Sequence, residues 1–113
     1  MGYWYKIVNC NDIGVIDITE KQKDFFNILK KIQDKAVVFA LSERKEKDSI
    51  EDTLYSATYD VLYGFLELID GYATDVIKLD LIDKETGISI RKNIELHDVC
   101  ANYLRYSYHE SNE

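Results

Sequence analysis

Proline is absent from this 113-residue sequence, glycine occurs five times, and cysteine and histidine occur twice each. Because the chain also lacks a glycine/serine-rich stretch and an internal repeat, nothing in it marks a domain boundary. We therefore expect residues 1–113 to form a single domain. A chain of this length buries about two-thirds of the surface that it exposes when unfolded, which is enough for a core of its own.

The scarcity of cysteine and histidine limits the chemistry that the chain can carry. Cys10 and Cys100 are too few for a disulfide framework, and no pair of thiols or imidazoles has the spacing of a zinc site. The carboxylates do not follow the calcium-loop pattern, and the glycines stand too far apart for a phosphate-binding loop. We expect reduced thiols, no metal and no cofactor.

Long apolar runs are also missing, since no stretch approaches the roughly 18 residues needed to cross a bilayer. The chain begins MGYWYK, without the basic region and apolar core of a secretory signal, and Lys6 stands where a myristoylation motif requires serine or threonine. These features predict a cytoplasmic protein that does not enter a membrane.

Acidic residues are abundant, and they are unevenly distributed. The net charge is −7 in total, with +1 on residues 1–48 and −8 on residues 49–113. Nucleic acid would be repelled by the second half, because its phosphates need clustered lysine and arginine. A basic protein partner would be attracted, although the same charge could simply keep a small domain soluble.

The first half of the chain predicts two strands, a helix and a third strand. Residues 3–8 and 13–18 are rich in aromatic and β-branched residues, and they flank a turn at residues 9–12. Thr19 and Gln22 have the spacing of a capping box, so a helix should begin there and end near Lys35. The apolar run from Ala36 to Leu41 is short and bounded by charge, which favours a central strand buried on both faces.

The second half predicts the longest helix, a hairpin and a final helix. Ser49 can cap a helix that runs to Asp70, where Gly71 suits the position after a helix end. Residues 75–82 alternate between apolar and polar, and residues 88–91 would return antiparallel after the turn at residues 83–87. Asn93 can cap the last helix. The resulting order is ββαβαββα, an α+β domain with an antiparallel or mixed sheet covered by helices.

The helix expected after Ser49 has two apolar or aromatic stripes. Leu54, Ala57, Val61, Phe65 and Leu68 cluster on one face, which should point to the core. Three tyrosines, spaced four residues apart and flanked by carboxylates, form a second stripe far from that face. This stripe either packs within the fold or is a partner interface, and tyrosine is enriched at interfaces. The candidate interface residues are Asp52, Tyr55, Tyr59, Tyr63, Glu67 and Asp70.

A catalytic site is not predicted. His97, Asp98 and Cys100 are close in sequence, but Cys100 continues an apolar helix face, where a thiol is usually inert. The paired carboxylates occur in charged segments near turns, where nothing raises a carboxyl pKa for acid/base chemistry.

Three hypotheses about function follow. The leading one is a small acidic protein-binding module, of the inhibitor or immunity-protein kind, that masks a basic surface of a partner. The second is a homodimeric assembly protein in which the face of Tyr55, Tyr59 and Tyr63 meets its own copy. The third is an enzyme or small-ligand binder whose pocket is built from residues far apart in the sequence.

Overall fold

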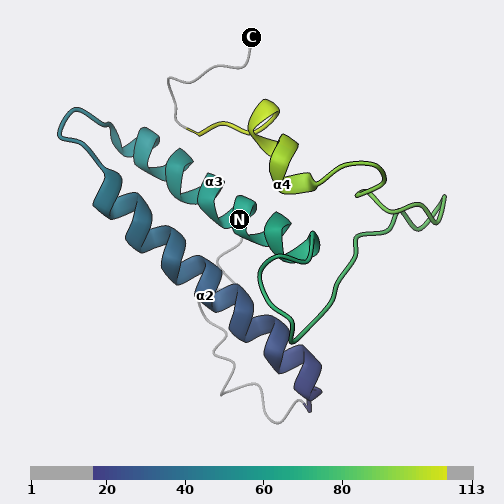
Figure 1. The fold of residues 1–113 in the computed structure, drawn as a ribbon. Coiled ribbons are helices and arrows are strands. Elements are labelled where there is room, and N and C mark those ends of the chain that lie inside the picture. The colour runs from purple at the N-terminus through teal and green to yellow at the C-terminus, as the bar shows by residue number, and fades with distance from the viewer. Residues whose placement is uncertain (1–16, 107–113) are drawn as a thin grey trace, which may run out of the picture.

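The computed structural model describes residues 17–106. Two long helices, α2 (Glu20–Glu43) and α3 (Ile50–Ile69), are followed by a long connection, the short helix α4 (Leu96–Val99) and the 3-10 helix η2 (Cys100–Asn102). Figure 1 shows α2 and α3 side by side, with α4 on the other side of α3. The described residues therefore form a helical layer with α3 in its middle.

Helix α2 begins where the capping box predicts. The Gln22 N–H donates to the Thr19 hydroxyl at 3.0 Å, and the Thr19 N–H donates to the Gln22 side-chain oxygen at 2.8 Å. The helix continues to Glu43, so the prediction of a central strand at residues 36–41 is wrong. Within that run only Ala36 and Ala40 are buried, at the i, i+4 spacing of one helix face.

Helix α3 also begins and ends where expected. The Ser49 hydroxyl accepts from the Asp52 N–H, and the Asp52 carboxylate accepts from the Ser49 N–H, both at 3.1 Å. Asp70 closes the helix, and Gly71 follows with a φ of 89°, a left-handed conformation that glycine adopts without strain. At 20 residues α3 is shorter than α2, which has 24, so the expectation that it would be the longest helix is wrong.

Helices α2 and α3 approach closely at one glycine. A Cβ added at Gly64 would lie 2.8 Å from the Ile32 Cγ2 atom, a distance that real Cβ contacts do not reach. Farther along the same face of α2, the small residues Ala36 and Ala40 are 3% and 4% exposed. The absence of a side chain at position 64 thus lets the two backbones come together.

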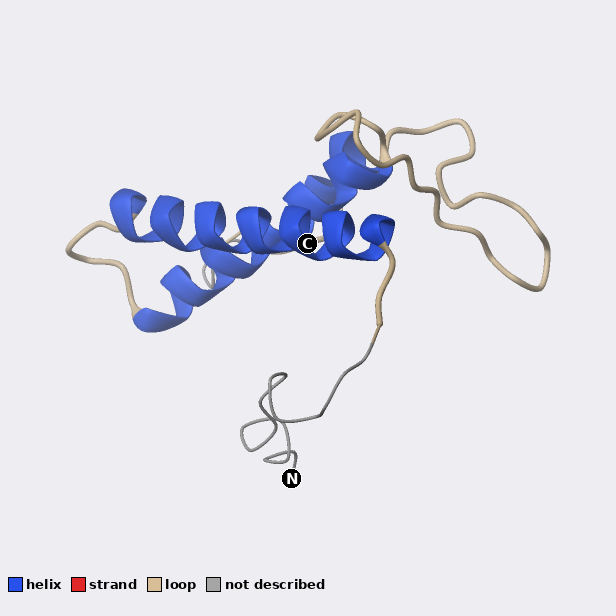
Figure 2. Ribbon diagram, turned by 90° about the horizontal axis from the view of Figure 1, so that it is seen from below, coloured by secondary structure: helices blue, strands red, loops and turns tan. Residues whose placement is uncertain are grey.

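The connection from Gly71 to Glu95 contains no regular strand. A single antiparallel bridge joins Ile82 and Ser89 around the predicted turn, and the strands expected at residues 75–82 and 88–91 are wrong. Figure 2 shows this segment as a loop that extends away from the helices. The apolar alternation still has a structural use, because Ile77 is buried against the helices.

The last helical segment is shorter than predicted. Asn93 does not cap it; Asn93 has a φ of 66°, and α4 starts after Glu95. Leu96 and Cys100 are buried as expected for the apolar face, but Tyr103 is 79% exposed because the helix has already ended.

Across residues 17–106 there is no sheet, so the predicted α+β class and the ββαβαββα order are corrected to a helical fold. The expected first strand and turn, and nearly all of the second strand, lie outside the described residues. Lys35, expected near a helix end, is internal to α2. Within the described part of the chain, no helix is long and apolar enough to cross a membrane.

Candidate functional site

The tyrosine stripe of α3 lies against the C-terminal segment of the same chain. The Tyr59 hydroxyl is 3.7 Å from the Cys100 sulfur. The Tyr59 ring meets the Tyr106 ring edge-on, with 5.2 Å between the ring centres. The Tyr63 ring meets His97 edge-on at 5.7 Å, and the Arg105 guanidinium lies 5.9 Å from the centre of the Tyr55 ring. All three tyrosines are partly buried. The stripe therefore forms much of the contact between α3 and the residues that follow it.

Asp70 is the central polar group of this contact. Its side chain is completely buried, and one carboxylate oxygen accepts from the His97 ring nitrogen Nδ1 at 2.6 Å and from the His97 backbone N–H at 2.9 Å. The other oxygen lies 3.2 Å from the Arg91 Nε in an ion pair whose geometry is not that of a hydrogen bond. One carboxylate thus holds the end of α3, the connection and the start of α4 together.

The burial and the hydrogen bonds of this cluster shift the titration of its members. Burial alone would raise the pKa of Asp70, but hydrogen bonds from His97 and from the Leu96 backbone outweigh it and lower that pKa. The hydrogen bond to Asp70 raises the pKa of His97, against the opposing effect of burial. Burial raises the pKa of Tyr59 to about 12, with Cys100 contributing. The pair of Asp70 and His97 is therefore stabilised in its charged form.

The same cluster contains three side chains that can serve as metal ligands. Donor atoms of Asp70, Glu95 and His97 lie within 4.8 Å of one another, a mixed oxygen and nitrogen set. However, Arg91 and His97 already neutralise Asp70, and a metal would have to displace the short Asp70–His97 hydrogen bond. The contacts fit a structural ion network better than a metal centre.

The arrangement of His97, Asp98 and Cys100 does not assemble a nucleophile. The Cys100 thiol is buried and donates to the His97 carbonyl at 3.4 Å, while the His97 ring points its Nδ1 to Asp70 and places its Nε2 3.4 Å from Asp98. With its side chain 8% exposed, the imidazole is not open to a substrate. Cys100 acts as a small buried residue at this contact.

The remaining predicted interface residues have local roles. Asp52 is buried as the capping partner of Ser49. Glu67 is partly buried next to Tyr63. Burial raises the pKa of Tyr63, and the negative charge of Glu67 raises it further. The structure thus brings Tyr59, Tyr63 and Asp70 together at one contact, and Tyr55 lies nearer the start of α3. That these residues contact a partner stays a prediction.

A different surface, on α2 and α3, is apolar and uncovered. Five large side chains on it are between 45% and 62% exposed: Phe26, Val37 and Leu41 on α2, and Leu54 and Leu62 on α3. We call this surface the apolar side.

Helix geometry places four of these five residues on the same side of the layer. Counted at roughly 100° per residue from the contact of Ile32 with Gly64, four of them are displaced in the same rotational sense on both helices. Leu41, nine residues after Ile32, comes out opposite the contact, at the outer edge of α2. Because α2 and α3 run antiparallel, the same sense on both helices means the same side. Sequence reasoning did not single out Phe26, Val37 or Leu41. Extending the helical period of α2 through residues 36–41 would have found Val37 and Leu41.

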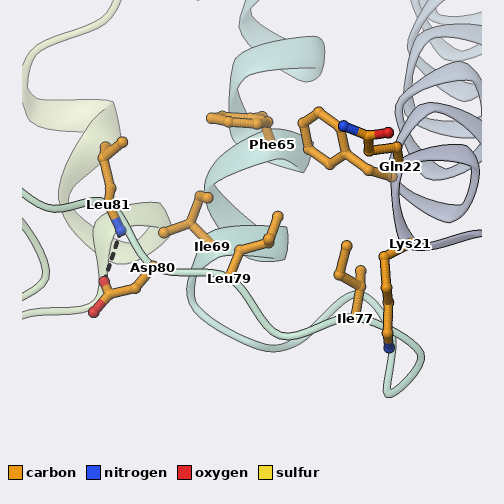
Figure 3. A pocket seen from close by; sticks show the side chains of 9 residues that line it. Lys21, Gln22, Phe65, Ile69, Ile77, Leu79, Asp80 and Leu81 are labelled. Atoms are coloured by element: carbon orange, nitrogen blue, oxygen red, sulfur yellow. Dashed lines mark hydrogen bonds between the residues drawn. The ribbon is translucent and has the colours of Figure 1, made fainter. Parts of the chain in front are cut away.

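A shallow groove lies at the start of α2 and the end of α3. The groove has a volume of about 370 Å³, and its walls are apolar side chains from both helices and the connection: Phe25, Phe65, Ile69, Ile77, Leu79 and Leu81. Lys21, Gln22 and Asp80 are its polar members, and Figure 3 shows Asp80 and Lys21 at opposite ends. A hydrogen bond of 2.7 Å from the Lys21 ammonium to the Val76 carbonyl ties the connection to α2.

Comparisons of the chain with protein-family models, with curated proteins and with solved structures find no match. The geometry of the described residues therefore carries the functional argument.

Proposed function

We propose that this protein is a small acidic protein-binding module whose partner covers the apolar side of α2 and α3. The supporting observation is the exposure of five large apolar side chains, four of them on one side of a helical layer and Leu41 at its edge. Domains normally bury such a side beneath a second layer, because exposed apolar surface is unfavourable in water. A partner protein would supply that second layer.

The charge of the chain indicates what kind of partner would bind. Helix α3 carries four carboxylates and no lysine or arginine, and residues 49–113 have a net charge of −8. A partner with basic residues around an apolar patch would match both properties. Opposite charges would speed association and make it sensitive to salt.

The tyrosine stripe has a smaller part in this proposal than the sequence suggested. The rings of Tyr59 and Tyr63 already contact Cys100, Tyr106 and His97, so a partner at these rings would have to compete with the C-terminal segment. The tyrosine stripe is thus already covered by contacts within the chain, whereas the apolar side is not. We therefore propose that the interface lies on the apolar side.

Site-specific photo-crosslinking tests the proposal. A benzoylphenylalanine at Val37 or Leu54 on the apolar side should crosslink to the same partner, whereas the same residue at Lys35, displaced to the other side of α2, should not. We expect the crosslinked partner to be basic. The yield of crosslinked product should fall several-fold as the salt concentration rises from about 0.05 to 0.5 M.

Two outcomes would contradict the proposal. Equal crosslinking from Lys35 would show that contact is not specific to the apolar side. Crosslinks found only between copies of the chain would support the homodimer hypothesis instead, and sedimentation equilibrium would confirm it.

A further inference from the structure

The groove is a shallow, open depression among the described residues, and its polar groups are already engaged within the chain. The Gln22 side-chain oxygen accepts from the Thr19 N–H, and the Lys21 ammonium donates to the Val76 carbonyl. The Asp80 Oδ1 accepts from the Leu81 N–H and the Ser89 hydroxyl, both at 2.7 Å. What the groove offers a ligand is thus mainly apolar wall.

We propose that this groove is the anchor point of the interface and takes one aromatic side chain of the partner, next to a lysine or arginine of the same partner. This inference rests on the proposed function and adds the chemistry of the residue that enters first. Tryptophan and tyrosine dominate the energetics of protein interfaces when they fill such depressions.

The dimensions of the groove favour an aromatic side chain. A volume of about 370 Å³ is at the lower end for sites that hold small molecules, which suits one or two rings. The rings of Phe25 and Phe65 are among the walls, so that an entering ring could pack against them edge-on or offset. The groove lies on the apolar side, because Phe65 and Ile69 are displaced from Gly64 in the same sense as Leu62.

The charge at the rim favours a basic neighbour for the aromatic residue. The hydrogen bond from Ser89, together with that from the Leu81 backbone and the nearby charge of Arg91, lowers the pKa of Asp80. At the opposite end the Lys21 ammonium is turned to the Val76 carbonyl. A lysine or arginine beside the entering ring would therefore be attracted at the Asp80 end.

Capped dipeptides test this inference on the full chain. We would titrate acetyl-Trp-Lys-amide, acetyl-Trp-Glu-amide and acetyl-Ala-Lys-amide into isotope-labelled protein and follow the backbone amide signals by NMR. The Trp-Lys probe should give saturable shifts confined to residues 21–25, 65–69 and 77–81, with a Kd on the order of 1 mM, as expected for so small a ligand.

The two other probes separate the aromatic from the basic requirement. The Trp-Glu probe should bind several-fold more weakly at about 0.05 M salt and nearly as well as Trp-Lys at about 0.5 M salt, since salt screens the charge at Asp80. The Ala-Lys probe should leave these signals unchanged. Equal shifts from Ala-Lys, or shifts spread over the whole chain, would overturn the inference.

A matched pair of variants locates the binding. Leu79→Asp puts a charge into the groove wall and should weaken Trp-Lys binding at least about tenfold, while Ile90→Asp, in the same connection but outside the groove, should leave binding unchanged. Both residues lie in the connection outside the helices, so folding can be checked from the unshifted signals of α2 and α3.

Other occupants would show themselves in the same spectra. Groove signals that change with protein concentration in the absence of a probe would indicate a second copy, and groove signals that change in a Trp4→Ala variant would indicate this chain's own tryptophan. Either result overturns the inference. It would leave the crosslinking result at Val37 and Leu54 intact, so the two proposals can fail separately.

Discussion

The two sides of helix α3 contact their neighbours through different chemistry. Toward α2 the contact is apolar and built on small residues, with Gly64 against Ile32 and with Ala36 and Ala40 buried. Toward α4 it is aromatic and ionic, centred on Asp70 and His97. At the contact between α3 and α4, polar groups lie against partners in the same chain. Helices α2 and α3, in contrast, leave large apolar side chains exposed to solvent. A helix can thus be closed on one side and open for binding on another.

Removing the charge of Asp70 should have the largest effect on stability. Asp70→Asn leaves His97 and Arg91 beside a neutral amide in a buried position, and we expect the free energy of unfolding to fall by about 3 kcal/mol or more. Urea denaturation followed by circular dichroism measures it. Asp75→Asn is the control: that side chain is 99% exposed and pairs only loosely with Lys78, so its effect should stay below about 0.5 kcal/mol.

Filling the close approach between α2 and α3 should have a smaller effect. Gly64→Leu would force the Ile32 side chain and the backbones apart at a cost of about 1–3 kcal/mol, less the gain of about 1 kcal/mol in helix propensity. Combining it with Ile32→Ala should recover part of the loss, because the two positions share one contact. Strictly additive losses in a double-mutant cycle would show that the two positions are not coupled.

The smallest expected effect is the pH dependence that comes from the pair of Asp70 and His97. His97 has a raised pKa in the folded protein, so its contribution to stability is complete below about pH 6.5 and is lost as the pH rises through the raised value. Asp70 has a lowered pKa, so its contribution is complete above about pH 4 and is lost as the pH falls through the lowered value. Stability from this pair should therefore be greatest between about pH 4 and 6.5.

Thermal unfolding across pH 3–9 measures this dependence. A His97→Gln variant keeps a polar side chain but cannot be protonated, so the loss of stability above about pH 6.5 should be reduced in it. An unchanged decline in that variant would assign the effect to another group.

The starts of both long helices could be predicted from the sequence, because capping is local. Thr19 with Gln22, and Ser49 with Asp52, lie three residues apart and satisfy each other's backbone groups whatever the rest of the fold does. Gly71 similarly marked the end of α3. Such signals need only a few neighbouring residues to be read correctly.

The class of the fold could not be predicted, because an apolar run does not reveal its own period. Residues 36–41 suit a buried strand and a helix equally, and only the contact of Ala36 and Ala40 with α3 distinguishes the two. Of the apolar face at residues 75–82, Ile77 is buried, but Leu81 is 40% exposed. A strand also needs a neighbour to share its hydrogen bonds.

The candidate site could be predicted only in part, because its contacts join residues that are far apart in the sequence. Asp70 and the tyrosines were proposed as interface residues, which stays a prediction. The contact of Asp70 with His97 spans 27 residues of sequence, and no local pattern indicates it. The apolar side was hidden by the mistaken strand, since a helix ending near residue 35 has no Val37 or Leu41 to expose.

The position of Asp70 at the exact end of α3 has a consequence for how the protein opens. The same residue closes the last turn of that helix and binds the first residues of α4, so neither can separate without disturbing the other. Backbone amides in the final turn of α3 and in residues 96–104 should then exchange with solvent as one cooperative unit, at a common rate, while the loop between the two long helices exchanges on its own.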